Sequence, residues 1–241
     1  DQGYAQNPAG RARRRWLGPM GFLPSVATIA SWDKVGRAVE HKRGAHFVNA
    51  GKVLLVDPEG LAGADEINAA QGATGPTEEA RWDEHTFAHG IRYLQAHRPR
   101  FLHISLNDSD EYGHLGDLPA YLESLRTYDR NMIALVDALE SMGTYGQRTT
   151  LIVTTDHGRG SADRWKSHGA NPESAAIWMY ARGPHTLQAG IRKDGGEFTH
   201  LDLRPTIERL LGLCPLDGAS GTPMEDLLGF TSKDAWRCIP Q

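Results

Sequence analysis

Two short motifs and one further histidine bring together residue types that bind divalent metals. Asp110-Glu-Tyr-Gly-His114 places a carboxylate four residues before a histidine, and Thr154-Thr-Asp-His-Gly-Arg-Gly160 places Asp156 directly before His157. His168 follows in a Ser-His-Gly sequence. Carboxylate oxygens and neutral imidazole nitrogens suit Zn²⁺, and also Mn²⁺ or Fe. The pattern therefore predicts a metal site with five candidate ligands: Asp110, His114, Asp156, His157 and His168.

The spacing within each motif allows the ligands to converge. On a loop or a first helical turn, Asp110 and His114 would lie on one side of the backbone. Asp156 and His157 are adjacent, so they converge only where the backbone turns sharply, which the glycines after them permit. Taken alone, an Asp-His-Gly turn after a strand can arise by chance, and a single histidine such as His168 is more often a surface residue. The combination is more specific, because both motifs directly follow hydrophobic segments.

The elements that must position these residues follow from the hydrophobic pattern. Short apolar runs rich in β-branched residues predict strands, and apolar residues at helical spacing predict helices. The expected strands cover residues 26–32, 52–57 (edge-like), 100–106, 149–155 and 175–181, and the expected helices cover 83–97, 119–142 and 203–211. Asp202 is the expected N-cap of the last helix and Gly212 its stop, and residues 57–80 are expected to form a loop. Strands alternating with helices predict an α/β fold with a largely parallel sheet, in a single domain over residues 1–241.

Composition limits the other classes of function. The chain has 241 residues, 23% of them charged, and a net charge of −4, which gives no reason to expect a nucleic acid partner. The one basic cluster, Arg11-Ala-Arg-Arg-Arg15, is interpreted as a solvated helix face or a mobile terminus, near a possible short helix over residues 9–17. No apolar run is long enough for a transmembrane helix.

The two cysteines leave the cellular compartment open. Cys214 and Cys238 could form one disulfide in an exported protein, and two free thiols are equally compatible with the cytosol. The chain starts at Asp1 without a methionine, which we interpret as a processed, cut or partial product.

Residues 98–212 resemble the alkaline phosphatase superfamily, especially its nucleotide pyrophosphatase/phosphodiesterase-like branch and bacterial proteins with an Asp-His-Gly-Arg-Gly signature. Ser31-Trp-Asp33 also looks like the end of the family's second strand, and residues 202–212 look like its closing helix. The resemblance implies a three-layer α/β/α fold with two divalent metals, Zn²⁺ in the first place and Mn²⁺ as the alternative. It implies that Asp110, His114 and His168 bind one metal, and that Asp156 and His157 bind the second.

The resemblance also implies a catalytic nucleophile that we assign to no residue of this sequence. In the family, a Thr or Ser and a further Asp come from a strand and helix that precede the Ser-Trp-Asp strand. We therefore expect the N-terminal strand and the nucleophile helix to be missing from residues 1–241. Arg159 and Lys166 could contact phosphate oxygens, and solvent-exposed salt bridges are an equally plausible role for them.

Three hypotheses about function follow. The first is a metal-dependent hydrolase of small phosphate mono- or diesters, with sulfate or phosphonate esters as related substrates. The second is a catalytically incomplete metal-binding remnant or scaffold domain. The third is a mutase of the cofactor-independent phosphoglycerate mutase type, which would need an inserted second domain where residues 57–80 are too short to supply one. Without a first strand the sheet would expose an apolar edge, so we also expect self-association.

Overall fold

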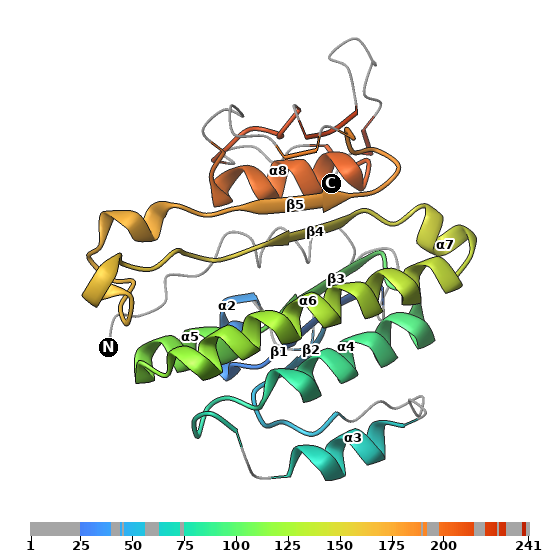
Figure 1. Cartoon of the computed structure of the whole chain (residues 1–241). Coiled ribbons are helices and arrows are strands. Elements are labelled where there is room, and N and C mark those ends of the chain that lie inside the picture. Colours follow the sequence, from blue (N-terminus) through green and yellow to red (C-terminus); the bar gives the residue numbers. More distant parts are fainter. Residues whose placement is uncertain are drawn as a thin grey trace. The chain divides into compact units, whose positions relative to one another are not determined.

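The computed structural model describes residues 25–39, 44, 46–55, 63–72, 75–188, 190–191, 198–214, 220–225, 227–229 and 238–239. These residues form two compact units, which are described separately (Figure 1). The first unit extends to Met142 and includes Trp165–Ser167; the second contains Gly143–Arg164 and the residues from His168 onward. The basic cluster at residues 11–15 and the possible helix over residues 9–17 lie outside the described residues. The expectation of a single domain stays a prediction.

The first unit contains a three-stranded parallel sheet with five helices in its described part. The strands are β1 (Val26–Ala30), β2 (Phe47–Ala50) and β3 (Phe101–Ser105), in the order β2-β1-β3. The helices are α2 (Asp33–Val39), α3 (Ala64–Gln71), α4 (Asp83–His97), α5 (Asp108–Leu115) and α6 (Leu118–Ser141). β1 pairs in parallel with both neighbours, Ala27 lying opposite Phe47 on one side and Leu102 on the other. The predicted α/β fold with a parallel sheet is confirmed.

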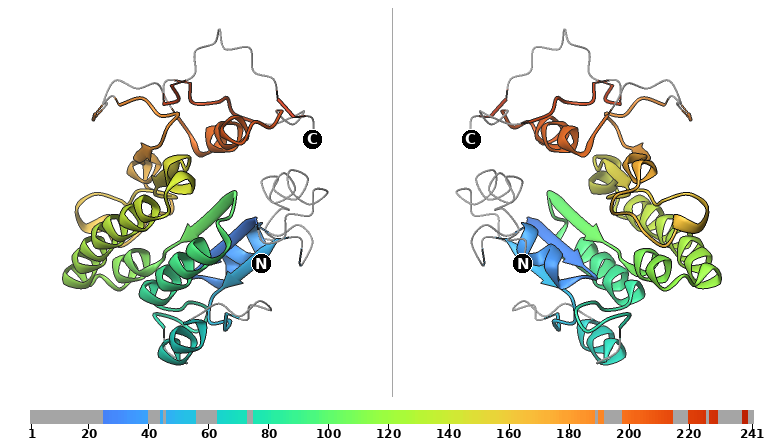
Figure 2. Two further views of the ribbon diagram at one scale, coloured as in Figure 1. Left: turned by 90° about the vertical axis from the view of Figure 1, so that its right-hand side faces the viewer. Right: turned by 90° about the vertical axis from the view of Figure 1, so that its left-hand side faces the viewer.

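Helices cover both faces of this sheet. Side chains alternate between the faces of a strand, so Ala27 and Ile29 share one face. On that face the core consists of Ala27, Ile29, Leu55, Ala64 and Tyr93, with Phe47 and Leu102 packed against it. Tyr93 belongs to α4, which lies beside the sheet in Figure 2. On the other face α2 approaches β2 so closely that a Cβ at Gly36 would lie 3.2 Å from that of Ala50. This unit therefore has the predicted three layers.

Two sequence expectations in this unit are wrong. The strand expected at residues 52–57 is absent from the described residues 52–55, because β2 lies earlier and Gly51 turns the chain at φ 65°. The loop expected over residues 57–80 contains α3, whose acidic first turn favours a helix start. Gly63 and Gly72, at positive φ, bound α3, and these flanking glycines made the segment resemble a loop. α2 was not predicted.

The long periodic segments were predicted well. α4 has the predicted bounds, β3 lies within residues 100–106, and α6 is shifted from its prediction by one residue at each end. α6 begins at an N-cap, Asp117, whose side chain accepts a hydrogen bond of 3.0 Å from the Ala120 amide.

No helix in the described part of the chain has the length and apolar character that crossing a bilayer requires.

The second unit contains two antiparallel strands and short helices in its described part. Its elements are α7 (Thr144–Gln147), β4 (Leu151–Thr154), the 3₁₀ turns η2 (Ala162–Arg164) and η3 (Pro172–Ala175), β5 (Met179–Arg182) and α8 (His200–Leu210). The strand predicted over residues 149–155 is present as β4, but it pairs antiparallel with β5, Val153 lying opposite Tyr180. β5 starts later than the predicted residue 175, because the residues before it form η3.

The start of α8 differs from the prediction by three residues. Thr199, not Asp202, is the N-cap, and Asp202 is the third helical residue of a capping box. One carboxylate oxygen of Asp202 accepts a 2.8 Å hydrogen bond from the Thr199 amide, and the other accepts one of 2.7 Å from the Thr222 amide. Gly212 follows the helix at φ 71° and is the predicted stop.

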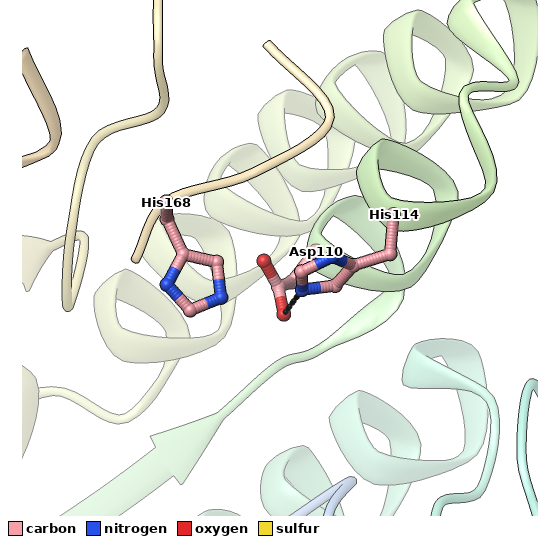
Figure 3. Close-up of side chains that lie close together, drawn as sticks. All are labelled: Asp110, His114 and His168. Atoms are coloured by element: carbon pink, nitrogen blue, oxygen red, sulfur yellow. Dashed lines mark ion pairs between the residues drawn. The ribbon is translucent and has the colours of Figure 1, made fainter. Parts of the chain in front are cut away.

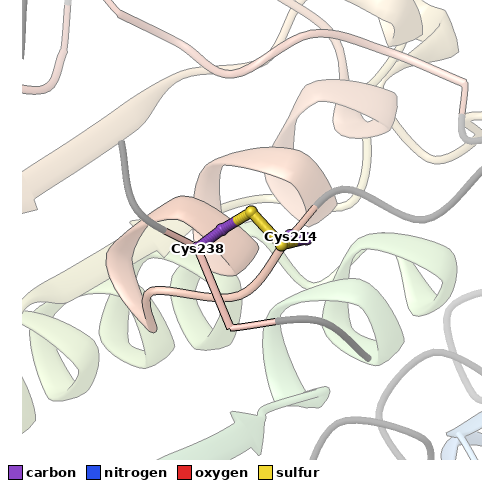
Figure 4. Close-up of a disulfide and its surroundings, with 2 residues drawn as sticks. All are labelled: Cys214 and Cys238. Carbon is purple, nitrogen blue, oxygen red and sulfur yellow. A yellow bond between two sulfur atoms is a disulfide. The ribbon is translucent and has the colours of Figure 1, made fainter. Parts of the chain in front are cut away.

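A disulfide links the two cysteines of the second unit (Figure 4). The Cα atoms of Cys214 and Cys238 lie 4.7 Å apart. A short parallel bridge lies beside the disulfide: the Cys214 amide donates to the Ile239 carbonyl at 3.1 Å, and the Ile239 amide donates to the Gly212 carbonyl at 2.9 Å. The structure therefore adopts the disulfide alternative of the two that the sequence left open.

Loss of this disulfide should destabilise the second unit. Cys238→Ser should lower the free energy of unfolding by about 3 kcal/mol, since a loop of this length is no longer closed in the unfolded chain. Urea unfolding with and without a reducing agent measures the change. The reduced parent should unfold at the same urea concentration as Cys238→Ser. A parent whose unfolding free energy does not change on reduction would contradict the prediction.

His89 on α4 makes the stability of the first unit depend on pH. Its ring is fully buried, and neither ring nitrogen has a hydrogen-bond partner. Burial, with the charges of Arg81 and His85 nearby, lowers the pKa of His89 from 6.5 to about 4. The unfolded chain therefore takes up this proton more readily, and stability is lost as the pH falls from 6.5 towards 4.

His89→Leu should remove this dependence without cost at neutral pH, because an apolar side chain leaves no buried polar group unpaired. The parent should lose roughly 3 kcal/mol more than the variant between about pH 7 and about pH 4. Urea unfolding across this range, with His97→Leu as the control for loss of any histidine, measures the difference. Parallel stability curves for the parent and His89→Leu would show that the prediction is wrong.

Candidate metal centre

Asp110 and His114 lie one helical turn apart on α5. The Asp110 Oδ2 and the His114 Nε2 are 3.3 Å apart, and both side chains are partly open to solvent. Two ligand atoms that share one tetrahedral zinc ion lie roughly 3.3 Å apart, given zinc–ligand bonds of about 2.0 Å. The spacing anticipated from the sequence therefore gives a separation suited to one metal.

His168 is one peptide bond away from a segment that packs in the first unit. The Trp165 ring meets the Tyr121 ring edge-on, with the ring centroids 5.7 Å apart. The Lys166 side chain lies against the end of α5, where a Cβ at Gly116 would lie 2.5 Å from the Lys166 Nζ. Gly116 has φ 72° and no side chain, so the lysine can lie directly on its backbone.

Asp110, His114 and His168 lie close together (Figure 3). Each offers a ligand atom, and these atoms all lie within 4.8 Å of one another. In Figure 3, Asp110 lies between the two imidazole rings, and the dashed line marks its ion pair with His114. Among the described residues this is the one group of three or more metal-binding side chains. One carboxylate and two imidazoles fit Zn²⁺ and also Mn²⁺.

Asp156 and His157 follow β4 in the second unit. The Asp156 side chain is 88% exposed, and its Oδ2 lies 3.6 Å from the His157 Nε2. The His157 ring stacks on that of His168, with centroids 3.8 Å apart, and its Nδ1 lies 2.9 Å from the Gly158 carbonyl. A Cβ at Gly158 would lie 2.5 Å from the Ala176 carbonyl oxygen, so the backbone approach after this pair requires glycine. The pair belongs to no group of three ligands among the described residues, and a second metal there stays a prediction.

Arg159 and Lys166, the candidate phosphate-binding residues, also remain predictions. Lys166 is exposed to solvent beside Gly116, and Arg159 is half-buried two residues after His157.

Sequence analysis did not predict the buried polar network that lies behind α5. Asp83, the first residue of α4, is 1% exposed and accepts hydrogen bonds from the Asp108 amide at 2.7 Å and the Tyr128 hydroxyl at 2.6 Å. The Asp83 amide in turn donates to the Asp108 carboxylate at 3.2 Å. Ser31, directly after β1, also donates to Asp83. The one signal in the sequence was the acidic first turn of α4, which indicates a helix start but not its partners.

Burial shifts the pKa values of the ionisable groups in this network. It raises the pKa of Asp83, against the opposing effect of the hydroxyl and amide donors. Burial and the Asp83 carboxylate raise the pKa of Asp108 to about 8. The neighbouring Arg81 is also fully buried, donates to the Thr86 hydroxyl at 2.8 Å and to the Ala30 carbonyl at 3.2 Å, and has its pKa lowered to about 10 by burial. The carboxyl ends of β1 and β3 are therefore enclosed by buried polar groups.

Comparison with known proteins places the chain in a family. A profile described as the Metalloenzyme superfamily matches residues 35–193, well over half of the chain. The chain belongs to this superfamily. Its membership agrees with the resemblance to the alkaline phosphatase superfamily, and it implies a divalent metal.

The relatives that match are 2,3-bisphosphoglycerate-independent phosphoglycerate mutases. The mutase of Haloarcula marismortui is 25% identical over 213 residues, which cover 86% of this chain and 38% of the mutase. Those of Thermosynechococcus vestitus and Prochlorococcus marinus are 30% and 32% identical over 122 and 129 residues, which cover 46% and 49% of this chain and 21% and 22% of the mutases. The chain thus spans well under half the length of the relatives it matches. These matches do not support the phosphodiesterase branch that the sequence favoured.

Loss of one ligand should weaken metal binding strongly. Asp110→Asn keeps the shape of the side chain but removes its charge. Replacing a residue that supports a ligand can weaken metal binding by up to about 100-fold, so replacing the ligand itself should weaken Zn²⁺ or Mn²⁺ binding by more than that. Calorimetric titration of the metal-free protein measures the affinity. Glu111→Gln, the adjacent charge-removing change, should leave the affinity near that of the parent. Parent affinity in Asp110→Asn would remove Asp110 from the site.

Proposed function

We propose that this chain binds a divalent cation through Asp110, His114 and His168 and takes part in phosphoryl transfer on a small phosphate ester. The observation that carries the proposal is the group of three side chains within ligand distance of one another, in a chain of the Metalloenzyme superfamily. A bound divalent cation would supply charge neutralisation at the phosphate oxygens.

The protein's own groups would hold that cation in a defined way. Asp110 and His114 are fixed relative to each other by one turn of α5, so they would form the rigid side of the site. His168 lies in a segment without helix or strand, and it would complete the ligand set. Two imidazoles among three ligands favour Zn²⁺ over Mn²⁺.

A second metal at Asp156 and His157 is part of the proposal. Its support is the adjacent carboxylate and imidazole after β4 and the sharp approach at Gly158. Two metals per parent chain, falling to one in Asp156→Ala, would support the second site, and a single metal unaffected by Asp156→Ala would remove it.

The relatives favour a mutase-type reaction over hydrolysis. Their name makes a phosphoglycerate the first substrate to test, and a match covering 86% of this chain outweighs the shortness of residues 57–80 that argued against a mutase. In a mutase the phosphoryl group returns to the substrate at another position, whereas in a hydrolase water takes it. Hydrolysis of phosphate mono- or diesters is the second candidate, and metal binding without turnover is the third, because no nucleophile is assigned.

Activity measurements on the metal-loaded chain distinguish these candidates. Phosphorus NMR of a phosphoglycerate incubated with the zinc- or manganese-loaded protein should show its positional isomer, and inorganic phosphate would instead indicate a hydrolase. The reaction should be lost in His114→Ala, which removes a ligand, and retained in Glu111→Gln. A loaded protein that converts neither phosphoglycerate nor a nitrophenyl phosphate ester would overturn the phosphoryl-transfer proposal and leave metal binding alone.

A further inference from the structure

The first residues of α4 and α5 cap each other's helix. Neither N-cap residue, Trp82 for α4 or Asn107 for α5, caps its own helix with its side chain. Instead the Asp83 amide donates to the Asp108 carboxylate, and the Asp108 amide donates to the Asp83 carboxylate. The unpaired amides at the two helix starts are thus satisfied reciprocally across two elements.

The Asp83 carboxylate accepts more of these hydrogen bonds than the Asp108 carboxylate does. Its carboxylate accepts from the Asn107 amide at 2.8 Å and the Asp108 amide at 2.7 Å, which are consecutive amides at the start of α5. It also accepts from the Tyr128 hydroxyl of α6 at 2.6 Å and from Ser31. Tyr128 then accepts a 3.0 Å hydrogen bond from the Ser109 amide. Three successive amides, those of the N-cap and of the first two residues of α5, are therefore fixed by two side chains from other elements.

This anchorage matters because α5 is short and mostly unburied. The helix has eight residues, too few for an isolated helix to be stable. Gly113 is its one buried residue, and Leu115 at its end is 73% exposed. It packs against α6, the helix that carries Tyr128, and its Tyr112 ring stacks on the Trp82 ring with the centroids 6.1 Å apart. The hydrogen bonds at its first turn therefore contribute to setting the direction and rotation of α5.

The two candidate metal ligands follow this turn directly. Asp110 is the third residue of α5 and His114 the seventh, so their side chains project one above the other from the same face. Each residue of an α-helix advances about 1.5 Å and turns by about 100°. A small rotation at the first turn would therefore displace both ligand atoms together.

We propose that Asp83 and Tyr128 are positioning residues for the candidate metal centre: they fix the first turn of α5 so that Asp110 and His114 face a metal. The inference rests on the proposed function, because it assigns the ligand role to Asp110 and His114. Neither Asp83 nor Tyr128 would contact the metal.

The test compares metal affinity with stability in matched variants. Asp83→Asn replaces an acceptor oxygen with a donor opposite the amides of α5, and Tyr128→Phe removes the hydroxyl while keeping the ring. The control is Asn68→Ala on α3 of the same unit, whose side chain makes two hydrogen bonds with the Leu55 backbone, at 2.8 and 2.9 Å. The control variant therefore loses two part-buried hydrogen bonds of the same unit and leaves α5 unchanged. If Asp83→Asn fails to fold, Tyr128→Phe carries the test, because it leaves the other donors to Asp83 in place.

Two readouts are needed: Zn²⁺ affinity by calorimetry, and the visible spectrum of the Co²⁺-loaded protein at saturation. Asp83→Asn and Tyr128→Phe should each weaken Zn²⁺ binding by about tenfold or more, as changes behind a ligand shell commonly do, and should alter the Co²⁺ spectrum. Asn68→Ala, although less stable in urea, should keep the affinity and the spectrum of the parent.

The failures are distinguishable. A parent that binds no metal overturns the proposed function and this inference with it. A parent that binds metal, with unchanged affinity and spectrum in both variants, overturns this inference alone. An equal loss of affinity in Asn68→Ala would assign the effect to general stability and would also overturn the positioning role.

Discussion

A carboxylate buried as completely as that of Asp83 must be surrounded by hydrogen-bond donors, because an unpaired buried charge is strongly unfavourable. The donors come from the end of β1, the start of α5 and the middle of α6. Meeting this one requirement holds a strand and three helices, including α4 itself, in a fixed relation at the carboxyl end of the sheet. The candidate ligands Asp110 and His114 lie directly after this point, on a helix of eight residues that is too short to be stable alone.

The division between what could and could not be predicted from sequence follows the range of the interactions. α4 and α6 have long, periodic apolar stripes, a local signal, and both were predicted within one residue. α3 is short and flanked by glycines, so its local signal was that of a loop. The geometry of Asp110 and His114 was predictable because one helical turn fixes it. The role of Asp83 was not, because its partners Asp108 and Tyr128 are distant in sequence.

The same reasoning explains why sequence analysis identified the superfamily but favoured a branch that the matched relatives do not support. A carboxylate and two histidines within ligand distance meet the needs of a metal whatever the substrate is, so they indicate metal chemistry and not a branch of the superfamily. A mutase and a hydrolase differ in where the phosphoryl group goes, and a set of metal ligands does not by itself specify this. The metal-binding residues therefore indicate a class of chemistry, and substrate measurements are needed to separate its members.

The chain does not run through its two units in succession. Trp165–Ser167 belong to the first unit, although the residues before and after them belong to the second. A fragment that ends at Met142 would therefore lack the partner of the Tyr121 ring and leave the backbone at Gly116 uncovered. The first unit therefore cannot be isolated intact by a single cut, whereas a fragment that begins at Gly143 contains the whole second unit together with three residues of the first.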